Sequence, residues 1–167
     1  MPGKRGKKPP GSWSMYPYLH DQVADKLEED QLEYTFYEKD EDLGYINTYD
    51  TKIIGRFTCH NNKCSSPGWK SMVVAITIRE YSRSRYNVRV YHQRCLRCNH
   101  LSKPKLNEET YVDRVAYRIK KWNGVEVEKP PYDGKTTAPH EEDHCEGCKA
   151  GHCMKARENR EDDMAFA

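Results

Sequence analysis

All seven cysteines of the 167-residue chain fall into three closely spaced groups. The groups are Cys59-x4-Cys64, Cys95-x2-Cys98 and His140-x4-Cys145-x2-Cys148-x4-Cys153. Zinc prefers four sulfur or nitrogen ligands at the corners of a tetrahedron, and a Cys-x-x-Cys turn supplies two of them. Seven cysteines and one histidine make eight ligands, the number that two closed sites need. The spacing therefore predicts two structural zinc ions.

Three histidines compete for the eighth ligand position: His140, which we take as the ligand, and His144 and His152 as alternatives. A catalytic zinc would keep one coordination position open beside a general acid or base. His140-Glu141-Glu142 is similar to the His-x-Glu of nucleobase deaminases, but the Pro-Cys-x-x-Cys that should follow is missing. A redox Cys-x-x-Cys would follow the first strand of a βαβ unit, which this sequence does not predict. We expect no enzymatic activity.

Two segments of alternating polarity must position the cysteines. Residues 72–78 and 86–93 predict strands, and the short link between them predicts an antiparallel hairpin. Such a hairpin brings the chain before its first strand beside the chain after its second. The first site would then hold Cys59, Cys64, Cys95 and Cys98 at the open end, and the second would hold His140, Cys145, Cys148 and Cys153. A further strand is predicted over 51–58, leading into Cys59.

Two helices complete the predicted fold. Leu19, Val23 and Leu27 share one helical stripe, which predicts a short amphipathic helix. Asn107 is suited to cap a longer helix over 108–122, which would end at Asn123-Gly124. The fold class is therefore a small zinc-stabilised α+β domain, in which an antiparallel hairpin or sheet packs with one main helix.

The composition limits the hydrophobic core and the class of protein. Leu, Ile, Val and Phe supply only 25 of 167 residues, so apolar burial needs support from metal binding.

The longest apolar run, Met72–Ile76, is far too short to span a membrane. The basic N-terminus has no apolar segment behind it and does not read as a secretory signal. We expect an intracellular protein, cytoplasmic or nuclear or both, where cysteines bind metals more often than they form disulfides.

Charge is segregated along the chain although the net charge is only +2. Residues 21–50 carry eleven acids and two bases, whereas residues 79–105 carry eight bases and one acid. Two explanations are open: the acidic segment folds over a basic sheet, or the basic strands bind a polyanion.

The sequence divides into four parts. Residues 1–15 predict a disordered basic tail, 16–50 an acidic lead-in with the short helix, 51–153 the zinc-binding domain, and 154–167 a polar C-terminal tail.

Several motifs in order give the chain a family resemblance. These are GRFTCHNNKC, Gly68-Trp69-Lys70-Ser71, YHQRCLRCNHLSKP, TYVDRVAYRIKKW and PHEEDHCEGCKAGHC. Together they resemble the 3CxxC-type zinc-finger domain of receptor-transporting proteins and of uncharacterised fungal proteins, over residues 51–153. The resemblance implies that the seven cysteines are zinc ligands and that His140 is the matching histidine.

The chain departs from the family pattern in two ways. Four residues instead of two separate Cys59 from Cys64, which leaves His60 as an alternative ligand in the first site. Receptor-transporting proteins typically carry a C-terminal membrane anchor, and the sequence up to Ala167 contains none. We therefore do not transfer receptor trafficking at a membrane.

Two functions remain open from the sequence. The first is a chaperone-like or adaptor-like module that binds an unidentified protein through its acidic segment and exposed tyrosines. The second is RNA binding through arginines interleaved with tyrosines on the basic strands. The candidate arginines are Arg79, Arg83, Arg85, Arg89, Arg94 and Arg97, with Tyr81, Tyr86 and Tyr91 between them. No small-molecule substrate is predicted.

Overall fold

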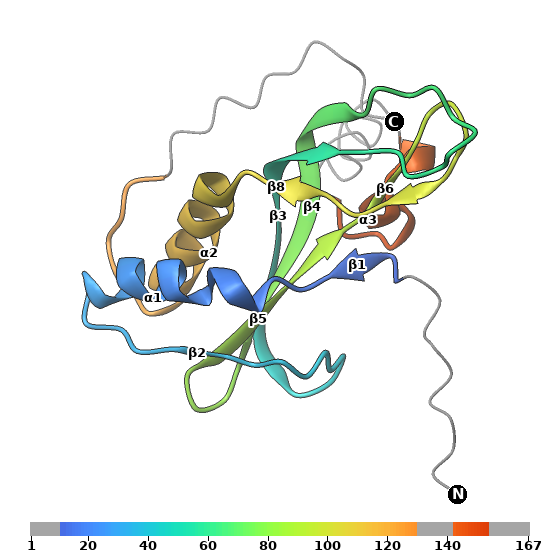
Figure 1. The fold of residues 1–167 in the computed structure, drawn as a ribbon. Coiled ribbons are helices and arrows are strands. Elements are labelled where there is room, and N and C mark those ends of the chain that lie inside the picture. The colour runs from blue at the N-terminus through green and yellow to red at the C-terminus, as the bar shows by residue number, and fades with distance from the viewer. Residues whose placement is uncertain (1–10, 130–141, 154–167) are drawn as a thin grey trace, which may run out of the picture.

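The computed structural model of the chain describes residues 11–129 and 142–153 (Figure 1). The C-terminal tail, most of the predicted tail over 1–15, and the proline-rich stretch before the last cysteines lie outside these residues.

The centre of the fold is a six-stranded sheet in the order β1-β5-β4-β3-β8, with β2 also pairing with β5. The strands are β1 (Trp13–Ser14), β2 (Thr35–Phe36), β3 (Tyr45–Phe57), β4 (Trp69–Tyr81), β5 (Arg85–Tyr91) and β8 (Lys105–Leu106). Strands β6 (Gln93–Arg94) and β7 (Leu101–Ser102) form a separate antiparallel pair. The predicted hairpin is confirmed as β4 and β5, with Ile78 opposite Val88. The strand predicted over 51–58 begins earlier, at Tyr45.

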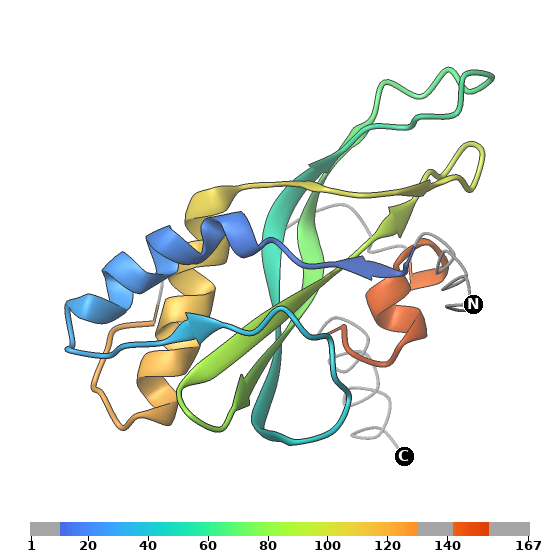
Figure 2. The ribbon, with the colours of Figure 1, turned by 60° about the horizontal axis from the view of Figure 1, so that its bottom comes forward.

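Helices cover both faces of this sheet (Figures 1 and 2). They are η1 (Pro17–Leu19), α1 (His20–Glu28), α2 (Glu108–Trp122), η2 (Glu142–His144) and α3 (Glu146–Lys149). Helix α2 has the bounds that the sequence predicts, and the Asn107 side chain accepts a hydrogen bond from the Thr110 backbone N–H as its N-cap. The α+β fold class is therefore confirmed.

The main core lies between one sheet face and the pair α1 and α2. Leu19, Val23 and Leu27 of the predicted helical stripe are fully buried there. A second, smaller cluster lies on the opposite face, where Val73, Ala75 and Tyr91 pack against the segment that carries the last cysteines. One face of the sheet thus packs against the apolar core, and the other face packs against a cysteine-rich layer.

The acidic segment folds over the basic strands. The Arg89 guanidinium, which is buried, lies 2.6 Å from Asp40 and 2.7 Å from Asp42, and Arg79 lies 3.2 Å from the same Asp42 oxygen. Hydrogen bonds from Arg89 and then Arg79 hold the pKa of the Asp42 carboxyl below its usual range. Of the two explanations for the charge segregation, these contacts support the first.

Part of the predicted disordered tail is ordered. Trp13 and Ser14 form β1 and pair antiparallel with Tyr91 and Val90 of β5. The Trp13 indole N–H donates to Asp40, and the Arg89 guanidinium lies over its ring. The tail prediction is therefore wrong for these residues, because contacts with a distant strand compensate the entropy of ordering them.

None of the helices in the described ranges is long and apolar enough to cross a membrane.

The Asp40–Arg89 contact gives a stability prediction. Asp40→Asn leaves the buried guanidinium with one charged partner fewer, so the free energy of unfolding should fall by about 1.5–3 kcal/mol, the contribution of a hydrogen bond to a charged group. Urea unfolding of the zinc-loaded protein measures this change. Glu38→Gln, which removes an exposed charge from the same segment, is the control. Equal unfolding midpoints for the two variants would contradict the assignment.

Candidate metal centres

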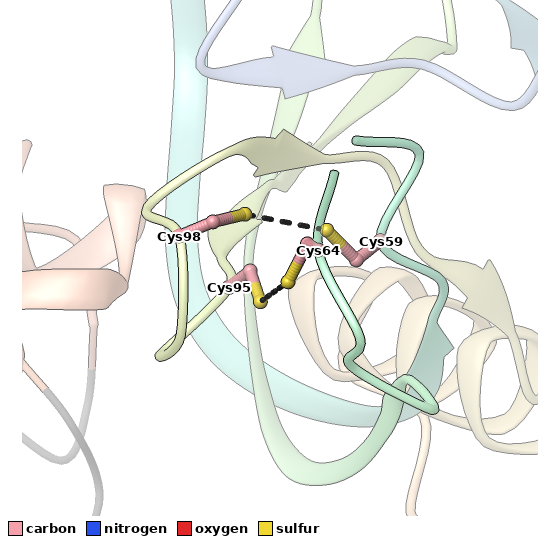
Figure 3. Close-up of side chains that lie close together, drawn as sticks. All are labelled: Cys59, Cys64, Cys95 and Cys98. Atoms are coloured by element: carbon pink, nitrogen blue, oxygen red, sulfur yellow. Dashed lines mark hydrogen bonds between the residues drawn. The ribbon is translucent and has the colours of Figure 1, made fainter. Parts of the chain in front are cut away.

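Four cysteines from two loops meet at the open end of the β4–β5 hairpin (Figure 3). The Sγ atoms of Cys59 and Cys98 lie 3.4 Å apart, those of Cys64 and Cys95 lie 3.8 Å apart, and all four lie within 4.8 Å of one another. Tetrahedral zinc, with bonds of about 2.3 Å to sulfur, would hold its sulfurs about 3.8 Å apart. The group therefore fits one zinc ion. Because four cysteines complete it, His60 is not needed as a ligand.

The strands dictate where these cysteines fall. Cys59 and Cys64 lie in the loop from β3 to β4, and Cys95 and Cys98 lie in the turn between β6 and β7. The first loop needs a glycine at its return point, since Gly68 has φ +86° and an added Cβ would lie 2.4 Å from the Phe57 carbonyl oxygen. The hairpin prediction for this site is confirmed.

Side-chain contacts join the two cysteine loops. Arg97 donates to the Ser65 carbonyl oxygen at 3.2 Å and to the Ser65 hydroxyl at 3.1 Å. The Ser102 hydroxyl donates to the Thr58 carbonyl oxygen at 2.6 Å. The four sulfurs are thus held by protein contacts as well as by metal.

Two of the four thiols of the first site are held toward thiolate. Burial opposes ionisation of Cys95, but the backbone N–H groups of Cys98 and Arg97 donate to its sulfur and lower the pKa of the thiol to about 6. The Asn61 side chain and the His100 backbone N–H lower the pKa of Cys98. The backbones of Asn61 and Ser66 donate to Cys59 and Cys64, but burial and the neighbouring sulfurs raise the pKa of these two thiols. Thiolate is the form that binds zinc, so these donors prepare the site for metal.

Three more cysteines form a second group on the opposite sheet face from α1 and α2. The sulfurs of Cys145, Cys148 and Cys153 lie within 4.8 Å of one another, and Cys145 accepts a hydrogen bond from the Cys148 backbone N–H as the N-cap of α3. The Cys145 and Cys153 sulfurs raise the pKa of Cys148 far above its usual range. Three thiolates this close require a cation between them, which a zinc ion would supply.

Among the described residues, no histidine or carboxylate joins the three cysteines of the second group. His140, the predicted ligand, lies outside the described residues. The alternatives His144 and His152 lie within them but do not belong to the cysteine group. Nδ1 of His152 instead lies 3.1 Å from the buried Asp50 carboxylate. His140 stays the predicted ligand.

Two residues of the second site were missed by sequence analysis, and both lie between Cys145 and Cys148. Gly147 packs so closely on the sheet that a Cβ would lie 2.5 Å from the Ala75 Cβ. The buried Glu146 carboxylate accepts from Arg94 at 2.7 Å and from the Ser12 hydroxyl at 3.1 Å. Their position inside a Cys-x-x-Cys turn was the one available signal.

The Arg94–Glu146 ion pair connects the two metal centres. Arg94 directly precedes Cys95 of the first site, and Glu146 directly follows Cys145 of the second. Gln93 also forms an isolated antiparallel bridge with Cys145. The segments that carry the two sites are therefore in direct contact through a part-buried ion pair and one backbone bridge.

Most of the residues proposed for an RNA surface are buried or engaged within the protein. Tyr81, Tyr86 and Tyr91 are at most 2% exposed and cannot stack on bases, and Arg79 and Arg89 are buried against the acidic segment. Arg94 pairs with Glu146. The side chain of Arg85 contacts Ser82 and the Tyr37 ring. Arg97 contacts Ser65 but is exposed, as Arg83 is.

Comparison with known proteins supports the metal assignment. The model of a zinc-binding domain family, the 3CxxC type of zinc ribbon, matches residues 52–151, which include six of the seven cysteines and His140. No curated protein and no solved structure matches the chain.

Metal removal tests the two-site assignment. Structural zinc contributes on the order of 10–16 kcal/mol of apparent binding free energy in zinc-finger peptides, as much as the whole stability of a typical domain. We expect two zinc ions per chain by elemental analysis and loss of the circular dichroism signal with a strong chelator. The same chelator saturated with zinc is the control. Fewer than two ions, or an unchanged spectrum, would contradict the assignment.

The ion pair between the sites can be tested separately. Glu146→Gln should accelerate zinc release from the second site and, through Arg94, from the first, because it leaves the guanidinium without its carboxylate. A chromogenic zinc chelator measures both phases. Lys149→Gln is the matched control, since Lys149 lies on the same helix and contacts Glu146 only at 3.4 Å from an exposed position. If only the slower or only the faster phase changes, the sites are independent.

Proposed function

Because the chain belongs to the zinc-binding 3CxxC family, we propose that it is a non-enzymatic, chaperone-like or adaptor-like module that binds a protein partner. In this proposal two structural zinc ions maintain the fold, and an exposed loop makes the contact.

The composition of the first metal centre supports a structural role for zinc. All four of its ligand positions are filled by cysteine sulfurs from the protein. A catalytic zinc keeps one position for water or substrate. The ligands of this centre therefore serve to hold two loops together.

The loop at residues 41–46, which we call the docking loop, carries the proposal. Leu43 is 83% exposed, Ile46 is 62% exposed and Tyr45 is 40% exposed. Three large apolar side chains within four residues are more than the scattered exposure that is normal at a surface. Glu41 and Asp42 precede them and are also exposed. The loop fits a partner that offers an apolar groove with basic residues at its edge.

The ion pairs described above anchor this loop. Arg79 donates to the Glu41 carbonyl oxygen and to the Asp42 carboxylate, each at 3.2 Å, and its guanidinium lies 5.0 Å from the Tyr45 ring centroid. The Tyr81 hydroxyl also donates to the Glu41 carbonyl oxygen, at 2.7 Å. A loop held in this way loses little entropy on binding, which favours affinity.

Apolar-to-polar substitution tests the docking loop. The double variant Leu43→Ser, Ile46→Ser should lose partner binding at least about tenfold, because truncating buried interface anchors costs more than 1–2 kcal/mol. Immobilised full-length protein would first select partners from an extract, and titration with the purified partner would then give the dissociation constant.

The control for this test is Tyr18→Ser, which removes a similarly exposed apolar side chain elsewhere. Zinc content should be the same in all variants. Equal affinities for the double variant and the control would refute the docking loop, and selection of RNA instead of protein would refute the proposed function.

A further inference from the structure

Three cations form a row across neighbouring strands at the β8 edge of the sheet. Arg56 of β3 lies directly opposite Lys70 of β4 on one side and directly opposite Lys105 of β8 on the other. Directly opposed residues point to the same face of a sheet, about 5 Å apart between backbones. All three side chains are exposed. The row therefore concentrates three positive charges within about 10 Å.

These cations have no acidic partner among the residues that the structure describes. No ion pair or hydrogen bond connects the Arg56, Lys70 or Lys105 side chain to another described residue. Like charges placed directly opposite each other destabilise a sheet. Elsewhere in this sheet an arginine is balanced by carboxylates, as Arg89 is by Asp40. An anion from outside would play the same part here.

An open cavity at the surface adjoins the row. It has a volume of about 270 Å³ and is lined by the three cations together with Ile54, Gly55, Leu106 and Asn107. No carboxylate from residues 11–129 or 142–153 lines it. The nearest acids along the chain, Glu108 and Glu109, are exposed in the first turn of α2 and do not line the cavity.

The lining selects the class of anion. Three cations match a compact group with several negative charges, and arginine and lysine are the usual partners of phosphate. None of the described residues that line the cavity is aromatic, so these residues offer no face on which a nucleic-acid base could stack. The volume is also below that of most pockets for larger organic ligands. We propose that Arg56, Lys70 and Lys105 form a binding site for a small oligophosphate anion, independent of the docking loop at the opposite end of β3.

The test uses pyrophosphate and the zinc-loaded full chain. Calorimetric titration at low salt should show one binding site, and Arg56→Gln should weaken binding about tenfold or more, the loss expected for one charge-assisted hydrogen bond. Arg83→Gln is the control, because it removes one exposed charge at the closed end of the β4–β5 hairpin. It should bind pyrophosphate like the unmodified protein.

Thermal unfolding is a second measurement, and it distinguishes loss of the anion site from loss of the fold. Without pyrophosphate, Arg56→Gln should unfold at the same temperature as the unmodified protein or higher, because it removes like-charge repulsion from the middle of the row. Pyrophosphate should raise the midpoint of the unmodified protein and of Arg83→Gln, but not that of Arg56→Gln.

Three results would overturn the site. The first is that pyrophosphate does not bind below millimolar concentration. The second is that Arg56→Gln and Arg83→Gln bind it equally. The third is that a single-stranded RNA binds through Arg56 more tightly than pyrophosphate does. None of these results bears on the docking loop, whose variants lie in a separate segment.

Discussion

Thiolate coordination at the open end of the β4–β5 hairpin is the constraint on which the rest of this fold depends. The aliphatic core is small, and it lies on the sheet face covered by α1 and α2. The loops beyond β3 and β5 reach past that core and contribute few apolar side chains. Four cysteines at sulfur distances suited to zinc replace apolar burial there. The metal therefore fixes the hairpin end, and the hairpin positions Arg94 and the strand β1.

The second metal centre completes the opposite face of the sheet. Its turn packs directly on the strands, since Gly147 leaves no room for a side chain above Ala75. The Glu146 carboxylate accepts hydrogen bonds from Arg94, next to the first centre, and from Ser12 of the N-terminal segment. One buried carboxylate thus joins three segments that are far apart in sequence. A buried charge with several donors is costly to disturb, so loss of the Glu146 carboxylate would affect the contacts of all three segments.

The sequence predicted those features that depend on local pattern. The alternation over 72–78, the helix over 108–122 with its Asn107 cap, and the grouping of Cys59 with Cys98 all follow from spacing and propensity, and the structure confirms them. The missed features depend on partners that no local pattern identifies. Strand β1 has two residues, and its order comes from Tyr91 and Arg89, more than seventy residues away. The sequence predicted that the tyrosines and arginines of the basic strands are exposed, because the residues that cover them lie in other segments of the chain.

The distribution of acids decides which cations of the sheet have a structural role and which are available to a ligand. Arg79 and Arg89 contact carboxylates because the acidic segment crosses the end of the sheet that β2 also borders. Arg56 lies at the other end of β3, beyond the reach of that segment, and its opposed neighbours are lysines. Arg79 and Arg89, by contrast, lie directly opposite the uncharged Asn87 and Thr77. The two sets of cations also differ in whether the described part of the chain supplies a carboxylate. Where it does, the charge stabilises a loop that can present apolar side chains. Where it does not, the repulsion between cations becomes a source of affinity for an anion, since binding relieves it.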